Sequence, residues 1–207
     1  MTHNTTNNRK YCSQCASILI KKCPNGDTCE RSVCEDCGHI EYDNPKVLVA
    51  CFATFENKLL WMRRKYEPMA GYWFIPAGFM ELGETPEEAT SRELFEETCA
   101  VIPPENLDFF MIGSLPDISQ IYLAYRGEIA DIKAIQTTDE ALETCLFTED
   151  EAPLDKLAFP TVIETFHLFY KEHRESNYGA HKASVVNNKH ILSPLASKAK
   201  PKQAHPK

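Results

Sequence analysis

The chain has 207 residues, of which 43% are hydrophobic and 25% are charged, and its formal net charge is -8. This length and composition are typical of a soluble protein with one main domain and a small additional one. The acidic balance argues against broad electrostatic binding to nucleic acid, which needs a local excess of Lys and Arg. The sequence has no run of the roughly 18 apolar residues that a membrane span needs, and its polar start lacks the apolar segment of a secretory signal. These features predict a cytoplasmic protein without a membrane partner.

Four of the nine cysteines form two Cys-x-x-Cys pairs. They are Cys12, Cys15, Cys34 and Cys37. Because a reducing compartment favours metal-bound over disulfide-bonded thiols, the two pairs predict a zinc ribbon over residues 12–40, after a polar N-terminus of residues 1–11. Four thiolates saturate zinc and leave no position for water, so the predicted zinc is structural. Cys23 and Cys29 lie between the pairs, and either could replace a ligand.

The second predicted domain covers residues 46–173 and mixes strands with helices. Apolar, β-rich runs predict strands over residues 47–56, 59–64, 72–80, 107–115, 119–129 and 144–147. A last amphipathic helix is expected over residues 161–173. The remaining residues, 174–207, contain few large apolar side chains and hold seven Lys or Arg against the single acid Glu175. They predict a flexible basic tail.

A helix between the third and fourth predicted strands has a well-defined start. Thr85 supplies an N-cap hydroxyl, Pro86 occupies the first helical position, and Glu88 completes a capping box. We expect this helix to continue to about residue 99. Pro103 and Pro104 prevent any long continuation.

Three carboxylates lie on one face of this predicted helix. Glu93, Glu96 and Glu97 stand at positions i, i+3 and i+4, where like charges destabilise a helix. Such a cluster needs either full solvation or a bound cation, and hard divalent ions take oxygen ligands of this kind. Taken alone, three glutamates favour the solvated face.

A longer pattern around these glutamates changes that balance. Its fixed positions are Gly78, Glu84, Arg92, Glu93, Glu96 and Glu97. The segment resembles the Nudix box at every defined position except one, where Cys99 replaces the final glycine; Ala100 is a weak match to the last apolar position. Because glycine would ease a left-handed helix end, Cys99 predicts that the helix ends differently.

The resemblance implies a fold and a chemistry. The fold is the Nudix α/β/α sandwich, an α+β architecture with a mixed sheet. The reaction is hydrolysis of a pyrophosphate bond with magnesium or manganese. By the same resemblance, Glu93, Glu96 and Glu97 are metal ligands with the Gly78 carbonyl as a further one, and Glu84 pairs with Arg92 to orient the loop and the helix.

Family members often take the general base from a later loop. The acids available there are Asp139, Glu140 and Glu143, of which Glu140 is the preferred base, with Glu93 as the second candidate. For any one of these loop acids, a solvated surface turn is an equally good explanation.

Candidate substrate contacts lie near the end of the second predicted strand. Arg64, rather than Arg63, is expected to face the substrate phosphates. The aromatic residues that could stack on a ring are Tyr66, Tyr72, Trp73, Phe79 and Tyr122. Tyr72 is the preferred one, although aromatic residues in strands more often pack in the core.

Together with the ribbon, the segments GYWFIPAGFMELGE, SQIYLAYRGEI and LAFPT are similar to the zinc-ribbon Nudix hydrolases that act on FAD and ADP-ribose. This resemblance implies a small nucleotide substrate and a homodimer. An NADH pyrophosphatase also combines a zinc ribbon with the box. It ranks second, because the Ser-Gln-Pro-Trp-Pro-Phe motif typical of those enzymes is missing from this chain. The competing class is a nucleotide sensor that binds nucleic acid through the ribbon or the basic tail, and a further possibility is a triphosphatase acting on damaged nucleotides. Against the sensor, the ribbon is acidic near its second cysteine pair, with Glu30, Glu35 and Asp36.

Overall fold

The computed structural model describes residues 9–195, and the chain divides into two compact units between Pro45 and Lys46. None of the helices in the described residues is both long and apolar enough to span a membrane.

The first unit is a three-stranded antiparallel sheet in the order β1-β2-β3. Its strands are β1 (Leu19–Lys22), β2 (Arg31–Cys34) and β3 (Ile40–Glu41). Its buried hydrophobic residues are Cys12, Val33 and Cys34. So small a core stabilises a fold weakly, and a bound metal ion is the usual supplement in such units.

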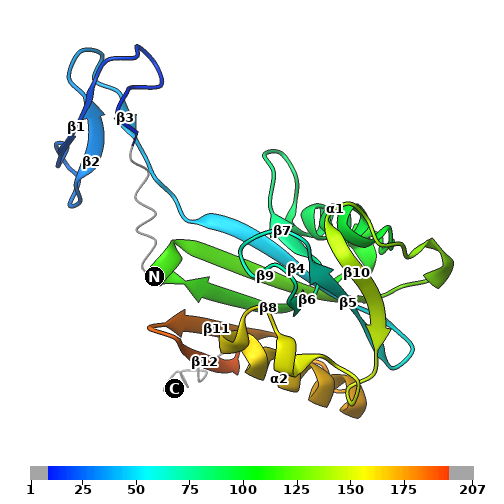
Figure 1. Ribbon diagram of the computed structural model, residues 1–207. Helices are drawn as coiled ribbons and strands as arrows, with labels where there is room; N and C mark the ends of the chain where they lie inside the picture. Colours follow the sequence, from blue (N-terminus) through cyan, green and yellow to red (C-terminus); the bar gives the residue numbers. More distant parts are fainter. Residues whose placement is uncertain (1–8, 196–207) are drawn as a thin grey trace, which may run out of the picture. The chain divides into compact units, whose positions relative to one another are not determined.

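The second unit contains the large sheet and both α-helices (Figure 1). Its strands are β4 (Lys46–Phe55), β5 (Lys58–Arg64), β6 (Trp73–Phe74), β7 (Ala77–Phe79), β8 (Asp108–Leu115), β9 (Gln120–Glu128), β10 (Ala141–Phe147), β11 (His181–Val186) and β12 (Lys189–Pro194). The helices are α1 (Pro86–Thr98) and α2 (Ile163–Glu175), and short 3-10 turns are η1 (Pro104–Asn106), η2 (Pro116–Ile118), η3 (Ile132–Ala134), η4 (Leu154–Lys156) and η5 (Pro160–Val162).

The large sheet is mixed and runs in the order β10-β5-β4-β9-β8-β11-β12, with β6 paired to β5 and β7 paired to β4. β4 with β9 and β8 with β11 are its parallel pairs. α1 covers one face of the sheet and α2 the other, which gives the expected α/β/α sandwich (Figure 1).

Alternation along the central strands builds a separate core on each face of the sheet. In β4, Ala50 and Phe52 pack with Phe166 and Phe169 of α2. The alternate residues of the same strand, Cys51 and Ala53, pack with Leu94 of α1. Successive side chains of a strand point to opposite faces, so a strand buried on both sides reads as a continuous apolar run, as β4 does.

Local signals explain why α1 begins and ends where it does. The Thr85 hydroxyl accepts a hydrogen bond from the Glu88 N–H, and the Glu88 carboxylate accepts one from the Thr85 N–H. This reciprocal capping satisfies two N–H groups that would otherwise lack a helical partner. At the other end, Cys99 takes the left-handed conformation at φ 57° and donates its N–H to the Phe95 carbonyl. The expectation that a cysteine would end the helix differently was therefore wrong, because Cys99 adopts the backbone conformation usually given to glycine.

The prediction of a flexible tail from residue 174 was also wrong for most of that segment. α2 continues to Glu175, and β11 and β12 form a hairpin whose first strand pairs in parallel with β8. Inward positions of β11 are buried at His181, Ala183 and Val185 although few of its side chains are large. The turn between the two strands, Asn187 and Asn188, has positive φ at both residues, a conformation that asparagine tolerates. The predictions for residues 1–8 and 196–207 lie outside the described residues.

Candidate active site and metal centre

The four cysteines of the two Cys-x-x-Cys pairs converge in the first unit. The sulfur atoms of Cys12, Cys15, Cys34 and Cys37 all lie within 4.8 Å of one another. Cys12 Sγ is 3.6 Å from Cys37 Sγ, and Cys15 Sγ is 3.4 Å from Cys34 Sγ. A tetrahedral zinc ion with Zn–S bonds of about 2.3 Å requires sulfur atoms about 3.8 Å apart. The cluster therefore has the dimensions of a four-thiolate zinc site.

The two intervening cysteines lie apart from this cluster. Cys23 is exposed and its thiol donates to the Asp27 carbonyl at 3.1 Å. Cys29 is also exposed, and its N–H donates to the Asp27 carboxylate. Both belong to the loop between β1 and β2, where Asp27 also binds Arg31 at 2.9 Å. The geometry thus favours the four cysteines of the two pairs over either replacement.

In the second unit, the Gly78 peptide and the Glu93 side chain meet closely. A Cβ atom at Gly78 would lie 2.1 Å from the nearest Glu93 carboxylate atoms. Gly78 is in β7, and Glu93 reaches it from the adjoining helix α1. Glycine is therefore needed here for close approach rather than for an unusual backbone angle, because only its missing side chain leaves room for the carboxylate.

The expected ion pair between Glu84 and Arg92 is present. Arg92 donates to both Glu84 carboxylate oxygens, at 2.8 and 3.0 Å, and to the Phe79 carbonyl at 3.0 Å. Its remaining donor bridges Glu93 at 2.8 Å and Glu96 at 3.1 Å. Hydrogen bonds from Arg92 lower the pKa of Glu84. Arg92 thus ties the loop before α1 to the helix and keeps two of its acids in position.

Glu97 is the most deeply buried acid of the helix, with 7% of its surface exposed. Its carboxylate accepts the Ala77 N–H at 2.8 Å, which fixes it against β7 beside the Gly78 peptide. Burial raises the pKa of Glu97 to about 8, and the nearby charges of Glu93 and Glu140 act in the same direction. Burial also raises the pKa of Glu93. Two carboxylates that are costly to ionise in one place either keep a proton or bind a compensating cation.

The loop that carries Glu140 is attached to the end of the same helix. The Thr138 hydroxyl donates to the Glu97 carbonyl at 3.0 Å, and the Glu140 N–H donates to the Thr138 hydroxyl at 3.3 Å. Glu140 itself is exposed, and its charge contributes to the raised pKa of both Glu93 and Glu97. The structure therefore brings Glu140 to the helix carboxylates. The part of Thr138 in holding this loop could not be predicted, because an isolated threonine gives no signal in the sequence.

The other two acids of that loop have different partners. Glu143 lies 3.4 Å from Arg63, and Asp139 lies 3.9 Å from Lys65. Arg64 is the next residue along β5, and it pairs in the sheet with Ala141, directly after Glu140. The Arg64 guanidinium donates to the Pro68 carbonyl at 2.9 Å and lies over the Phe159 ring, 5.6 Å from its centroid. Its charge lowers the pKa of Glu97 in opposition to burial.

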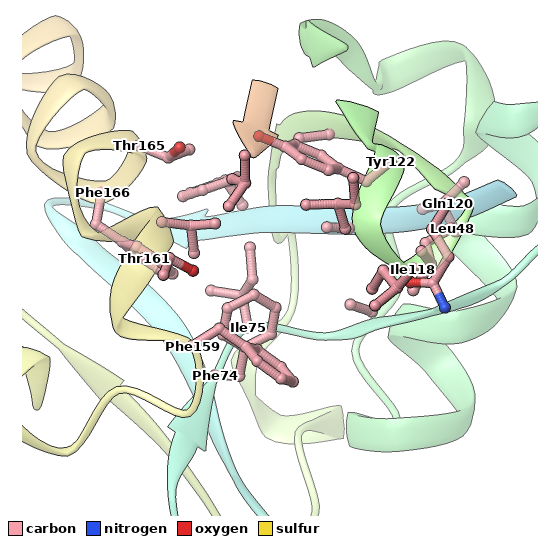
Figure 2. A pocket seen from close by; sticks show the side chains of 18 of the residues that line it. Leu48, Phe74, Ile75, Ile118, Gln120, Tyr122, Phe159, Thr161, Thr165 and Phe166 are labelled. Carbon is pink, nitrogen blue, oxygen red and sulfur yellow. The ribbon is translucent and has the colours of Figure 1, made fainter. Parts of the chain in front are cut away.

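A cavity of about 300 Å³ lies on the α2 face of the sheet and reaches β7 at Ala77. Figure 2 shows Thr161, Thr165 and Phe166 on its α2 side, and Leu48, Ile118 and Gln120 at the opposite end. Its aromatic walls are Phe52, Phe74, Tyr122, Phe159 and Phe166. Because Ala77 also binds Glu97, the cavity and the carboxylates adjoin through one short strand.

Of the aromatic residues predicted to stack on a substrate ring, the preferred one, Tyr72, does not line the cavity. Tyr122 lines the cavity, whereas Tyr72 is 44% exposed and lies outside its lining. Trp73 packs in the core against Phe147. Phe74, Phe159 and Phe166 were not among the predicted stacking residues, because their common cavity depends on strands and helices far apart in the chain. Tyr66 and Phe79 are exposed and line no part of it.

Comparison with known proteins gives matches over both units. Residues 44–168 match the NUDIX domain model, and residues 10–43 match the model described as Nudix N-terminal, a zinc ribbon. The ADP-ribose pyrophosphatase of Methanocaldococcus jannaschii is 34% identical over 126 residues, which are 57% of this chain and 69% of that protein. The NAD-capped RNA hydrolase NudC of Haemophilus influenzae is 41% identical over 85 residues, 40% of this chain but only 31% of that protein.

A solved structure agrees over a larger part of the chain. The crystal structure of a NUDIX hydrolase from Nitrosomonas europaea superposes with a TM-score of 0.79 and 35% sequence identity. The superposition covers 86% of this chain and 99% of that one. On these matches and on the geometry of the helix and loop, the chain belongs to the NUDIX domain family.

Proposed function

We propose that this chain hydrolyses the pyrophosphate bond of a nucleoside diphosphate derivative, with ADP-ribose and FAD as its preferred substrates. The observation that carries the proposal is the meeting of Glu93 and Glu97 at the Gly78 peptide, beside a cavity with aromatic walls. The relative from Methanocaldococcus jannaschii, named an ADP-ribose pyrophosphatase, supports the choice of ADP-ribose.

The residues at this position fit a divalent cation. Glu97 is buried and Glu93 is half-buried, and this burial raises the pKa of both acids, so an ion would relieve the cost of charging them. Glu93, Glu96, Glu97 and the Gly78 carbonyl would hold magnesium or manganese, which prefer oxygen ligands. When bound, such ions neutralise the oxygens of a pyrophosphate and stabilise the leaving phosphate.

The protein side chains have separate tasks in this proposal. Glu140 accepts the proton of the attacking water, since its exposed carboxylate is held near the helix acids by Thr138. Arg64 places a positive charge beside the substrate phosphates. Arg92 and Glu84 keep the loop and helix aligned, so that the carboxylates stay in place during turnover. The cavity holds a flat ring of the substrate.

The zinc ribbon has a structural task. Cys12, Cys15, Cys34 and Cys37 would bind one zinc ion and leave no position free for water. All nine cysteines are free of disulfide bonds, which is consistent with the reducing cytoplasm in which we place the protein. The homodimer implied by the family resemblance is tested by light scattering of the purified chain.

Product analysis tests the reaction. The zinc-loaded chain is incubated with magnesium or manganese and, in parallel, with ADP-ribose, FAD, NADH or a nucleoside triphosphate. We expect AMP with ribose 5-phosphate from ADP-ribose and AMP with FMN from FAD. Cleavage of the triphosphate alone would contradict the proposal. Absence of cleavage with every substrate, together with salt-dependent binding of nucleic acid, would favour the sensor hypothesis instead.

A second candidate substrate is NADH. The match to the NudC proteins, 41% identical over 85 residues, favours it, although the chain aligns with only 31% of those relatives. A higher kcat/KM for NADH, with AMP and reduced nicotinamide mononucleotide as products, would replace ADP-ribose as the preferred substrate.

The proposed general base has a matched control in its own loop. Glu140→Gln should lower kcat by about 100-fold or more, the usual contribution of a general base, with little change in KM. Glu143→Gln should leave kcat unchanged, because Glu143 is paired with Arg63 instead. Equal activities of the two variants would exclude Glu140 as the base.

A further inference from the structure

The cavity beside β7 has an amide side chain at one end. Gln120, Tyr122 and Ala124 alternate along β9, so their side chains share the face of the sheet that lines the cavity. Gln120 is half-buried, and its side chain makes no hydrogen bond with any other residue between 9 and 195. It lies at the end of the cavity opposite Thr161 (Figure 2). Gln120 therefore presents one donor and one acceptor to whatever occupies the cavity.

Most other polar groups in the lining already have partners. The Tyr122 hydroxyl donates to Met111 Sδ at 3.4 Å. The Asp117 carboxylate accepts the Asn187 N–H at 2.8 Å and so holds the turn between β11 and β12. Asn188 is exposed at this turn. Gln120 is thus the half-buried amide that remains available to a ligand among the described lining residues.

The walls of the cavity favour a flat ring. Phe74, Phe159 and Phe166 surround it with apolar surface, and Phe74 lies edge-on to both other rings at centroid distances of 5.2 and 5.9 Å. A ring held between such walls can be distinguished from other rings only along its edge. The edge of adenine that carries the N6 amino group and N7 offers one donor and one acceptor side by side, and a glutamine amide matches both.

We propose that Gln120 is the specificity-determining residue of the cavity and recognises the N6 and N7 edge of an adenine ring. This inference rests on the proposed function, because adenosine diphosphate is the part that ADP-ribose and FAD share. The corresponding edge of guanine carries two acceptors, O6 and N7, and a glutamine amide can satisfy only one of them. The cavity therefore selects adenine nucleotides over guanine nucleotides.

Binding of nucleoside monophosphates tests this assignment without any cleavage. Isothermal titration of the zinc-loaded full chain, with no magnesium or manganese, compares AMP, GMP and 7-deaza-AMP, which lacks the N7 acceptor. We expect the wild-type chain to bind AMP about fivefold more tightly than 7-deaza-AMP, the effect of one hydrogen bond. It should also bind AMP more tightly than GMP.

The isosteric variant Gln120→Glu removes the donor that faces N7. The affinity ratio of AMP to 7-deaza-AMP should then fall to about one or below. The new carboxylate can also repel the phosphate, but both ligands carry the same phosphate, so this repulsion does not affect the ratio. Asn57→Asp in the turn between β4 and β5 makes the same amide-to-carboxylate change away from the cavity and should keep the wild-type ratio.

Three results would overturn the inference. They are equal wild-type binding of AMP and 7-deaza-AMP, a ratio that changes in Thr161→Val but not in Gln120→Glu, and no binding of AMP at all. Each is distinguishable from failure of the proposed function, because cleavage of ADP-ribose with added metal is measured separately.

Discussion

Replacing Glu97 by glutamine should stabilise the metal-free protein while it abolishes activity. Burial raises the pKa of Glu97 from its ordinary value of 4.5 to about 8, so the folded chain keeps a proton there that the unfolded chain releases. The stability from this proton is fully present below pH 4.5 and is lost as the pH rises to about 8. Glutamine has the shape of the protonated acid and can still accept the Ala77 N–H.

The magnitude follows from that difference in pKa. Integrating the linkage relation at about 1.4 kcal/mol per pH unit gives a gain for Glu97→Gln of roughly 1 kcal/mol at pH 5 and on the order of 4 kcal/mol at pH 8. Glu93 also has a pKa raised by burial, and it contributes a pH dependence of the same sign to both proteins. The difference between wild type and variant therefore reports Glu97 together with its charge coupling to Glu93.

Urea unfolding measures this difference at several pH values without added magnesium or manganese and with zinc retained. Both tryptophans, Trp61 and Trp73, are buried in the second unit, so their fluorescence reports the unfolding of that unit alone. Glu105→Gln, an exposed replacement in η1, should show no such dependence. With metal and ADP-ribose, Glu97→Gln should lose at least about 100-fold in kcat/KM. The reasoning is refuted if the variant is no more stable than wild type at pH 8.

Three further replacements test other parts of the structure. Gly78→Ala would place a Cβ 2.1 Å from the Glu93 carboxylate and should lower kcat by about 100-fold, as measured by cleavage at saturating magnesium, while circular dichroism stays unchanged. Cys12→Ser should release zinc, measured by elemental analysis of the purified chain, whereas Cys23→Ser should retain it. Cys99→Gly should raise the free energy of unfolding by about 0.5–1 kcal/mol in thermal melts, because glycine takes a φ of 57° without steric cost.

Each of these expectations has a contrary result. Full activity of Gly78→Ala would mean that the Glu93 carboxylate can move without loss of function. Unchanged zinc in Cys12→Ser would exclude Cys12 as a necessary ligand. A lower melting temperature of Cys99→Gly would show that the packing of the cysteine side chain outweighs the strain of its backbone.

Elements with strong local signals could be predicted from the sequence. The capping box at Thr85 placed the start of α1, and the apolar run from residue 47 placed β4. The hairpin of β11 and β12 could not be found in this way, since β11 is held by parallel pairing with β8, which lies some seventy residues earlier. Its turn at Asn187 and Asn188 carried a local signal, but the low content of large apolar residues outweighed it.

The same distinction between local and long-range signals applies to the residues of the site. The pair of Glu84 with Arg92 and the contact of Gly78 with Glu93 belong to one short segment, so a sequence pattern could predict them. The cavity could not be predicted, because its walls come from β4, β9, η5 and β11 and exist only once the sheet has assembled. Gln120 is an ordinary polar residue at the start of a strand until Tyr122 and Ala124 are seen to share its face.

The position of Val185 and Asn188 in the cavity wall has a consequence for comparing relatives. The NUDIX match ends at residue 168, inside α2, yet both of these residues follow it in the C-terminal hairpin. The segment that carries the proposed metal carboxylates therefore lies inside the matched range, whereas part of the cavity wall lies outside it. Under the proposed function, we expect two proteins with the same box and different hairpins after α2 to share a reaction and to differ in the nucleotides that they accept.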